Sequence, residues 1–230
     1  MKLLLFDIDQ TLINTGGAGL RALDRACLKL FGLANSMQGI SPHGKTDPAI
    51  VRELFREKLG SSSPSASDIA SVLEAYVSFL RQEVFESPTY CVLPGVVSLL
   101  SEMIGRSDVM VGLETGNIEL GARIKLDRGG LNPYFSFGGF GSDFEDRTQL
   151  VRQAADRAAD RNGGAISPSD TFVIGDTPLD IEAGARCGFK TVGVATGSYS
   201  VQQLLECGAT LAVTDLAQGR DYFLRSTFIE

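Results

Sequence analysis

Residues 1–12, MKLLLFDIDQTL, determine how the fold begins. An apolar run of strand length, residues 3–6, ends at two aspartates, Asp7 and Asp9. Residues two apart in an extended chain lie on the same face, about 6.6 Å apart at ~3.3 Å of rise per residue. The pattern predicts a ligand site at the carboxyl end of a strand in a parallel sheet. Close carboxylates repel each other unless a proton or cation lies between them, so the pair favours a metal; a plain polar turn is the alternative.

A second acidic cluster follows another apolar run, in residues 171–184 (TFVIGDTPLDIEAG). Asp176 comes directly after the predicted strand 172–175, and Asp180 lies in the helical pattern that follows. Two strand ends that both carry carboxylates predict a hard-cation site, and oxygen ligands in a small, partly hydrated site favour Mg²⁺. Asp180 could instead cap the helix, because Asp is a preferred N-cap residue.

Composition indicates a folded, acidic protein. Of its 230 residues, 43% are hydrophobic and 21% charged, which excludes wholesale disorder, and the net charge of −7 argues against nucleic acid or an anionic membrane as partner. No apolar run approaches the roughly 18 residues of a membrane span, and Asp7 interrupts the leading apolar run too early for a signal peptide. The four cysteines lie far apart without a Cys-x-x-Cys pair, so we expect a reduced, cytoplasmic protein.

The apolar pattern divides the chain into two parts. Helical periodicity in residues 20–30, 48–58 and 69–84 predicts an all-helical insert, residues 15–88, after the first strand. From residue 94 onward, helical stretches alternate with short predicted strands at 109–113, 136–139, 172–175, 191–194 and 211–213. We therefore expect an α/β fold, a Rossmann-like doubly wound parallel sheet, formed by residues 1–14 and 89–230.

These segments resemble the haloacid dehalogenase (HAD) superfamily, and within it the phosphoglycolate-phosphatase-like phosphatases that carry a helical cap domain. The family's first motif, Asp-x-Asp-x-Thr, and its fourth, Gly-Asp-x-x-x-Asp, are matched by Asp7, Asp9, Thr11, Gly175, Asp176 and Asp180. Its second motif, a Ser or Thr at a strand end, is similar to Thr115-Gly116-Asn117. The resemblance implies a Rossmann-like core in which the helical insert is the cap that closes over the active site.

The resemblance also implies roles for the acidic residues. Asp7 would be the nucleophile that forms an aspartyl-phosphate, and Asp9 would be the general acid and base. The metal would lie on the carboxylates of Asp7 and Asp176 and on the backbone carbonyl of Asp9. Asp180 would support these ligands without contacting the metal itself, or it would bind a metal-bound water.

Phosphate oxygens would be bound by the turn Thr115-Gly116-Asn117, although Thr115 could equally cap the next helix. The family's cation is less clear, because the chain has no Lys-Pro pair between residues 130 and 175. Arg147, at a predicted helix start, is the first candidate, with a surface salt bridge to Asp143 or Glu145 as its alternative. Lys125 is the competing cation, but its place in the middle of a helix favours a solvated face.

The segment His43-Gly44-Lys45-Thr46-Asp47 of the helical insert precedes a helix. In related capped phosphatases this loop faces the active site, so His43 and Lys45 are expected to help select the substrate by contacting an anionic leaving group. Equally, Thr46 or Asp47 could serve only as an N-cap ahead of Pro48.

We therefore expect a Mg²⁺-dependent phosphatase that hydrolyses a small phosphorylated metabolite through an aspartyl-phosphate, as a monomer or homodimer, with neither nucleic acid nor membrane as partner. A sugar phosphomutase and a phosphonatase use the same fold; the latter needs a lysine for a Schiff base, and Lys45 is the only loosely suitable residue. A dehalogenase is disfavoured because Asp9 is present. A non-enzymatic phospho-acceptor or binding protein is the alternative of another class, disfavoured by the helical insert and by the presence of both Asp7 and Asp9.

Overall fold

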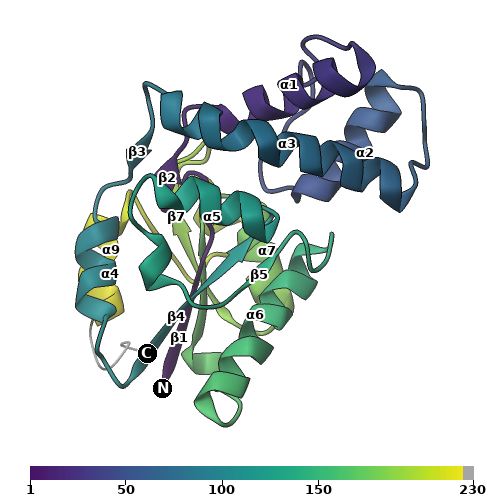
Figure 1. Ribbon diagram of the computed structural model, residues 1–230. Coiled ribbons are helices and arrows are strands. Elements are labelled where there is room, and N and C mark those ends of the chain that lie inside the picture. Colours follow the sequence, from purple (N-terminus) through teal and green to yellow (C-terminus); the bar gives the residue numbers. More distant parts are fainter. Residues whose placement is uncertain (225–230) are drawn as a thin grey trace.

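The structure, a computed structural model, describes residues 1–224, which form an α/β core with three helices set above one edge of its sheet (Figure 1). All strand pairs in the core sheet are parallel, and their order is β5-β4-β1-β6-β7-β8. The strands are β1 (Lys2–Phe6), β4 (Val109–Thr115), β5 (Gly138–Phe140), β6 (Thr171–Gly175), β7 (Lys190–Val194) and β8 (Leu211–Val213). The expected doubly wound parallel sheet is thereby confirmed.

Strand β1 lies inside the sheet and is buried along its whole length. Because successive side chains of a strand point to opposite faces, its leucines separate into two cores. Leu4 and Phe6 belong to one hydrophobic cluster, and Leu3 and Leu5 to another. This explains why the run is apolar without alternation, as expected for a strand covered on both sides.

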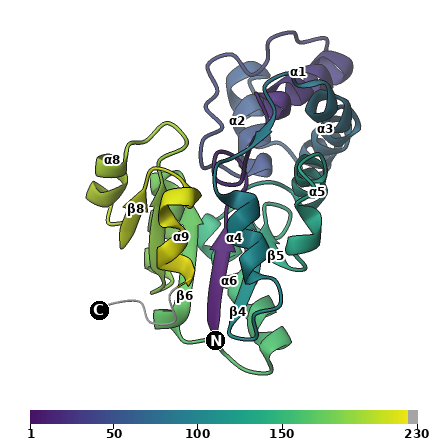
Figure 2. The same cartoon turned by 90° about the vertical axis from the view of Figure 1, so that its left-hand side faces the viewer.

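Helices cover both faces of the sheet (Figure 2). The cluster that contains Phe6 is covered by α4 (Val96–Met103), α5 (Glu119–Asp127) and α9 (Leu216–Leu224). The cluster that contains Leu5 is covered by α6 (Arg147–Asn162) and α7 (Pro178–Arg186). The short helix α8 (Val201–Glu206) packs through Leu204 against Ile181 of α7.

The helical insert contains α1 (Ala18–Phe31), α2 (Asp47–Lys58) and α3 (Ala66–Glu86), which share a hydrophobic cluster of their own. The N-cap of α2 is Thr46, whose Oγ1 accepts a hydrogen bond from the backbone N–H of Ala49, so the expected capping role is observed. The cluster also includes Ile124 of α5, so the insert packs on the core through this helix.

A two-stranded antiparallel ribbon joins the insert to the core. It pairs β2 (Ile13–Asn14) with β3 (Cys91–Val92), at the two places where the chain leaves and re-enters the core. Sequence periodicity did not predict these strands, because two residues are too few to show a pattern. The predicted strands also differ at their ends: β4 extends to Thr115, and β5 begins at Gly138 rather than at residue 136.

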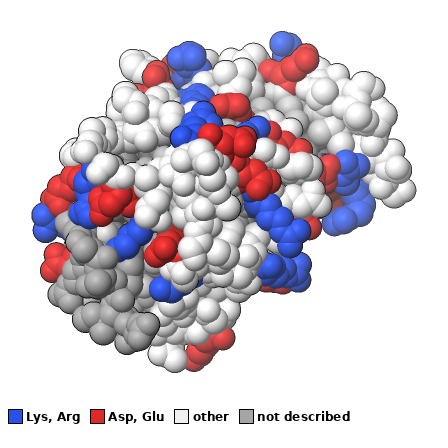
Figure 3. Space-filling view, turned by 90° about the horizontal axis from the view of Figure 1, so that it is seen from below, with Lys and Arg blue, Asp and Glu red and all other residues white. Residues whose placement is uncertain are grey.

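The surface is mixed in charge. On the face drawn in Figure 3, lysine and arginine side chains lie among aspartates and glutamates, and the described residues form no continuous basic area there. Within residues 1–224, no helix combines the length and the apolar character that a membrane crossing requires.

Candidate active site

Three strand ends meet at the edge of the sheet that faces the helical insert. Asp7 follows β1, Thr115 ends β4 and Asp176 follows β6, and β1 lies between β4 and β6. The chain continues from β1 to β4 and β5 on one side and then returns to β6 on the other side of β1, so the strand order reverses here, which is where ligands bind in open parallel sheets. A cavity of about 250 Å³ lies at this point, lined by these three residues and by side chains of the insert.

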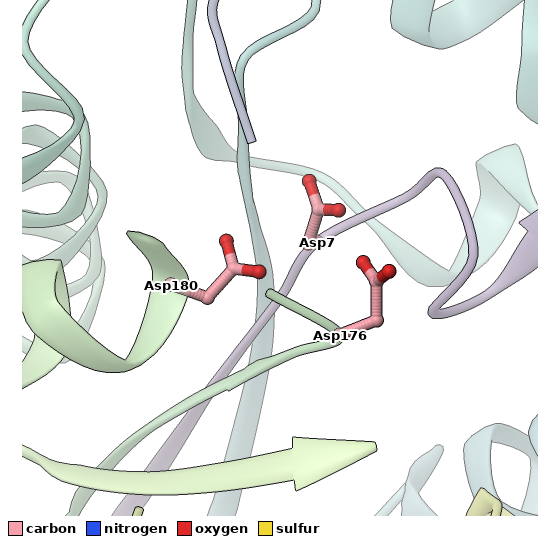
Figure 4. Close-up of side chains that lie close together, drawn as sticks. All are labelled: Asp7, Asp176 and Asp180. Carbon is pink, nitrogen blue, oxygen red and sulfur yellow. The ribbon is translucent and has the colours of Figure 1, made fainter. Parts of the chain in front are cut away.

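Asp7, Asp176 and Asp180 are buried, and each offers a carboxylate oxygen within 4.8 Å of the others. Figure 4 shows the three carboxylates around one space. Burial raises the pKa of Asp7 to about 7, although Arg147 opposes this shift. Burial, together with the neighbouring carboxylates of Asp180 and Asp7, raises the pKa of Asp176 to about 9. A cation between these groups would favour their ionised forms.

Asp180 is already engaged by the protein. Its Oδ2 accepts hydrogen bonds from the backbone N–H and the hydroxyl of Thr177, at 2.9 and 2.8 Å, and its Oδ1 contacts Arg147. The preceding strand approaches so closely that a Cβ at Gly175 would lie 2.3 Å from Asp180 Cγ. The expectation that Asp180 is the N-cap residue of the helix is wrong: the N-cap of α7 is Thr177, and Asp180 is the third residue of the helix and completes the capping box.

Asp176 differs from Asp180, because no group within residues 1–224 donates a hydrogen bond to its carboxylate. It lies against the backbone of Gly197, where a Cβ would come within 1.9 Å of Asp176 Oδ2. Asp7 and Asp176 thus present buried carboxylates in one cavity, and their oxygen donors fit the hard-cation site expected for Mg²⁺. The carboxylate of Asp9 accepts hydrogen bonds from Lys125 and Asn117 instead, so only the backbone carbonyl of Asp9 is left as its predicted metal ligand.

Arg147 connects the acidic cluster to Glu114 and to the helical insert. Its Nη2 lies 2.9 Å from Asp7 Oδ1 and 3.3 Å from Glu114 Oε1, and it contacts Asp180 as well. Its Nη1 donates to the carbonyl of Gly44 in the helical insert, at 3.3 Å. Burial would lower the pKa of Arg147, but the surrounding carboxylates raise it well above its ordinary value, so the guanidinium stays charged.

The alternative interpretation of Arg147, a surface salt bridge, is wrong. Asp143 pairs with Arg157 at 2.7 Å, and Glu145 pairs with Arg52 at 2.6 Å. Arg147 points inward instead, because its neighbour Asp146 is the N-cap of α6 and fixes the direction in which the helix begins.

Lys125 does not lie on a solvated face, and that expectation is wrong. Its side chain is buried, and Nζ donates to Asp9 Oδ2 at 2.7 Å and to Asn117 Oδ1 at 2.5 Å. The amide of Asn117 in turn donates to Asp9 Oδ2 and to Thr115 Oγ1, each at 2.8 Å. Helical spacing could have indicated the inward position of Lys125. Lys125 is about two helical turns beyond Asn117, so it lies on the side of α5 that faces the strand ends.

Two buried acids were not anticipated as part of the site. Glu114 precedes Thr115 and has no exposed surface; burial raises its pKa well above the ordinary value, and its carboxylate pairs with Arg147. Asp47 of the insert accepts a hydrogen bond from Ile118 N at 2.9 Å, at the start of α5, while its own N–H donates to Gly116 O at 2.7 Å. Asp47 therefore anchors the insert beside the turn Thr115-Gly116-Asn117.

The close approach of the insert explains Gly116, where a Cβ would lie 2.3 Å from the carbonyl oxygen of Lys45. His43 and Lys45 both line the cavity, as the sequence predicted. His43 is exposed, however, and Lys45 Nζ lies 2.5 Å from Glu53 Oε2 on α2.

The chain is similar to proteins named as phosphatases and hydrolases. A model of the haloacid dehalogenase-like hydrolase family matches residues 4–194. A Clostridium perfringens (strain 13 / Type A) protein named as the pyrophosphatase PpaX is 24% identical over 211 residues, which span 90% of this chain and 89% of that protein. A Dickeya dadantii (strain 3937) protein named as the phosphatase IndB is 24% identical over 202 residues, spanning 88% and 84%. The structure of a Pseudomonas syringae hydrolase, 22% identical, shares the fold with a TM-score of 0.73, over 96% of this chain and 97% of that one.

Proposed function

Because the chain belongs to the haloacid dehalogenase-like hydrolase family, we propose that it is a Mg²⁺-dependent phosphatase that hydrolyses a small phosphate monoester through an aspartyl-phosphate on Asp7. The observation that carries the proposal is the position of Asp7, which shares one small cavity with the carboxylate of Asp176 and the guanidinium of Arg147. A nucleophile, a cation site and a fixed positive charge are what phosphoryl transfer requires.

The reaction proceeds in two steps. In the first, an oxygen of Asp7 attacks phosphorus, the ester P–O bond breaks, and Asp9 gives its proton to the departing alkoxide. In the second, Asp9 takes a proton from water, whose oxygen attacks phosphorus; the bond to Asp7 breaks and inorganic phosphate leaves. Dividing one difficult displacement into two lowers the barrier of each, and a positioned carboxylic acid protonates the leaving group.

Fixed donors would hold the phosphate oxygens in these steps. Arg147 presents a buried fork beside Asp7, and Thr115 adds a hydroxyl at the end of β4. The ammonium of Lys125 and the amide of Asn117 hold the carboxylate of Asp9 at one position. Since these donors are in place before substrate binds, little reorganisation is required at the transition state.

Mg²⁺ would be held by the carboxylates of Asp7 and Asp176 and by the backbone carbonyl of Asp9. When bound, it supplies positive charge that offsets the charge of the phosphate. The same carboxylates have raised pKa values, so metal binding and proton release are coupled.

The test is phosphate release from a panel of small phosphate esters, with Mg²⁺ and with a chelator. Wild type is compared with Asp7→Asn and with Asp160→Asn, a matched change at an exposed position of α6. We expect metal-dependent release in wild type and Asp160→Asn, and none in Asp7→Asn. Release that persists in Asp7→Asn would contradict the aspartyl-phosphate mechanism.

The phosphonatase alternative is disfavoured by one contact. A Schiff base requires an amine that is free to react, whereas Lys45 Nζ is paired with Glu53 at 2.5 Å. A sugar phosphomutase would share the residues of the first step and would be recognised by formation of an isomeric ester in place of phosphate.

A further inference from the structure

We propose that the leaving group of the substrate is a small uncharged alcohol, and that the site discriminates against esters whose leaving group carries a second anionic group. The inference deepens the proposed phosphatase function and rests on it. It concerns the part of the cavity that remains once the phosphate lies beside Asp7, the part formed by the helical insert.

The first observation is that no permanent cation in the cavity is free. Three lysine or arginine side chains line it, and each is already paired with a carboxylate within the described residues. The pairs are Lys45 with Glu53 at 2.5 Å, Lys125 with Asp9 at 2.7 Å, and Arg147 with Asp7 at 2.9 Å. Lys45 is the one cation that the insert contributes, so the insert presents no unpaired lysine or arginine to a second anion.

The second observation is the excess of acid. Asp7, Asp9, Asp47 and Asp176 all line the cavity, and Asp47 comes from the insert. A bound cation would compensate Asp7 and Asp176 at the strand ends, and Lys125 already pairs with Asp9, but Asp47 has no ion-pair partner among the described residues. A carboxylate or second phosphate beside Asp47 would meet a like charge with no unpaired lysine or arginine to compensate it, which disfavours its burial.

The third observation is the apolar character of the insert side. Leu20 and Leu23 of α1 and Ile50 of α2 line the cavity together with Tyr76 of α3. Such side chains favour a leaving group with carbon surface over one that must remain hydrated. The cavity volume, about 250 Å³, lies below the ~300–1,000 Å³ of drug-sized pockets, so the alcohol must be small.

Tyr76 adds a specific polar group. Its side chain is only 1% exposed, it lines the cavity, and no group in residues 1–224 hydrogen-bonds to its hydroxyl. Gly19 keeps the adjoining space open, since a Cβ there would lie 3.8 Å from the Tyr76 hydroxyl and 3.6 Å from Lys125 Nζ. The hydroxyl therefore has no partner among the described residues, and an alcohol on the substrate would satisfy it as donor or acceptor.

The experiment uses two esters of equal length, 2-hydroxyethyl phosphate and 2-phosphoglycolate, which differ by a hydroxymethyl group in place of a carboxylate, together with pyrophosphate. Their kcat/KM values are measured for wild type with Mg²⁺. Their dissociation constants are measured by calorimetry on Asp7→Asn, so that the preference is tested even without turnover. We expect the hydroxyethyl ester to be favoured about tenfold or more in both measurements.

A charge change then tests the cause. Glu53→Gln releases Lys45 from its carboxylate, so the ratio of phosphoglycolate to hydroxyethyl phosphate, in kcat/KM and in affinity, should rise about tenfold. The matched control is Glu57→Gln on the same helix, which removes a surface pair with Arg56 and should leave the ratio unchanged. Because the readout is a ratio of two ligands on one protein, a loss of stability alone does not move it.

The outcomes separate the two proposals. Tighter binding of phosphoglycolate than of hydroxyethyl phosphate, or an unchanged ratio in Glu53→Gln, overturns the inference about the leaving group. Absence of phosphate release from every ester contradicts the proposed phosphatase function, while the dissociation constants continue to test the leaving-group preference.

Discussion

The two sides of the cavity are built differently. The core side brings together charged groups of both signs at three strand ends, whereas the insert side contributes mostly apolar groups, together with His43, Asp47 and one lysine that pairs with Glu53. In the proposed mechanism, charges on the core side would act on the phosphate, which every substrate of a phosphatase shares. Side chains of the insert would contact the part of the substrate that varies. Changes in the core should therefore alter all esters alike, and changes in the insert should alter the ratio between them.

Most of the free-energy cost of burying carboxylates also falls on the core side. Asp7, Glu114 and Asp176 all have pKa values raised by burial, because three strand ends and the start of α7 bring carboxylates together away from water. Arg147 offsets part of this cost by contacting several of them at once. On the insert side the corresponding buried acid is Asp47, which is held at the start of α5.

After loss of the nucleophile Asp7, the largest effect should come from removing Asp9, the proposed general acid. Asp9→Ala should reduce kcat about 10²–10⁴-fold for every alkyl phosphate, in line with the usual contribution of a positioned acid–base group. Aryl phosphates should lose less, since their leaving groups depart without a proton. Steady-state kinetics on an alkyl and an aryl series checks this. Equal losses in both series would show that Asp9 does not protonate the leaving group.

Arg147→Met tests whether one cation stabilises the buried carboxylates on the core side. The change leaves the buried carboxylates of Glu114 and Asp180 without their partner, so the free energy of unfolding should fall by about 3–5 kcal/mol. Urea unfolding measures it, with Arg157→Met as the comparison because its pair with Asp143 is half-exposed. Equal losses in the two variants would contradict the special position of Arg147.

Asp47→Asn tests the insert side through pH. Burial raises the pKa of Asp47 to about 6 against the pull of Lys125, from 3.8 for an ordinary Asp, so the folded protein binds this proton more tightly. Stability should therefore decrease as pH rises from about 4 to about 6. In Asp47→Asn this decrease is missing, and the variant should be more stable than wild type by about 3 kcal/mol at pH 7 and equal to it near pH 4. Thermal unfolding across that range measures the difference, and a difference independent of pH would contradict it.

The smallest effect should come from the outer contact between insert and core. Arg52 of α2 pairs with Glu145 at 2.6 Å, but both side chains are more than 40% exposed. Arg52→Ala should lower the free energy of unfolding by less than about 1 kcal/mol, because water screens exposed pairs. The kcat/KM ratio between the two test esters should not change. A larger loss in urea unfolding would mean that packing of the insert on the core depends on this pair.

Local patterns predicted the fold and the acidic centre because both depend on residues that are close together in the sequence. An apolar strand followed by Asp7 or Asp176 is visible in the sequence, and the carboxyl ends of parallel strands necessarily lie at the same edge of the sheet. Lys125 was misjudged because its burial is a tertiary effect: the insert packs on α5 and covers a face that would otherwise be exposed. Glu114 was missed for a related reason, since it reads as part of a strand and only the inward turn of Arg147 gives it a partner.

The ribbon of β2 and β3 has a consequence for how such proteins diversify. Ile13 pairs with Val92 and Asn14 with Cys91, so the outgoing and returning chains are neighbours. Paired strands lie about 5 Å apart, a gap that a two-residue turn can close. A gene could therefore lose, lengthen or replace everything between these strands while the register of β1 and β4 stays intact. The β2–β3 ribbon would thus allow the same core to carry different inserts, each selecting a different substrate.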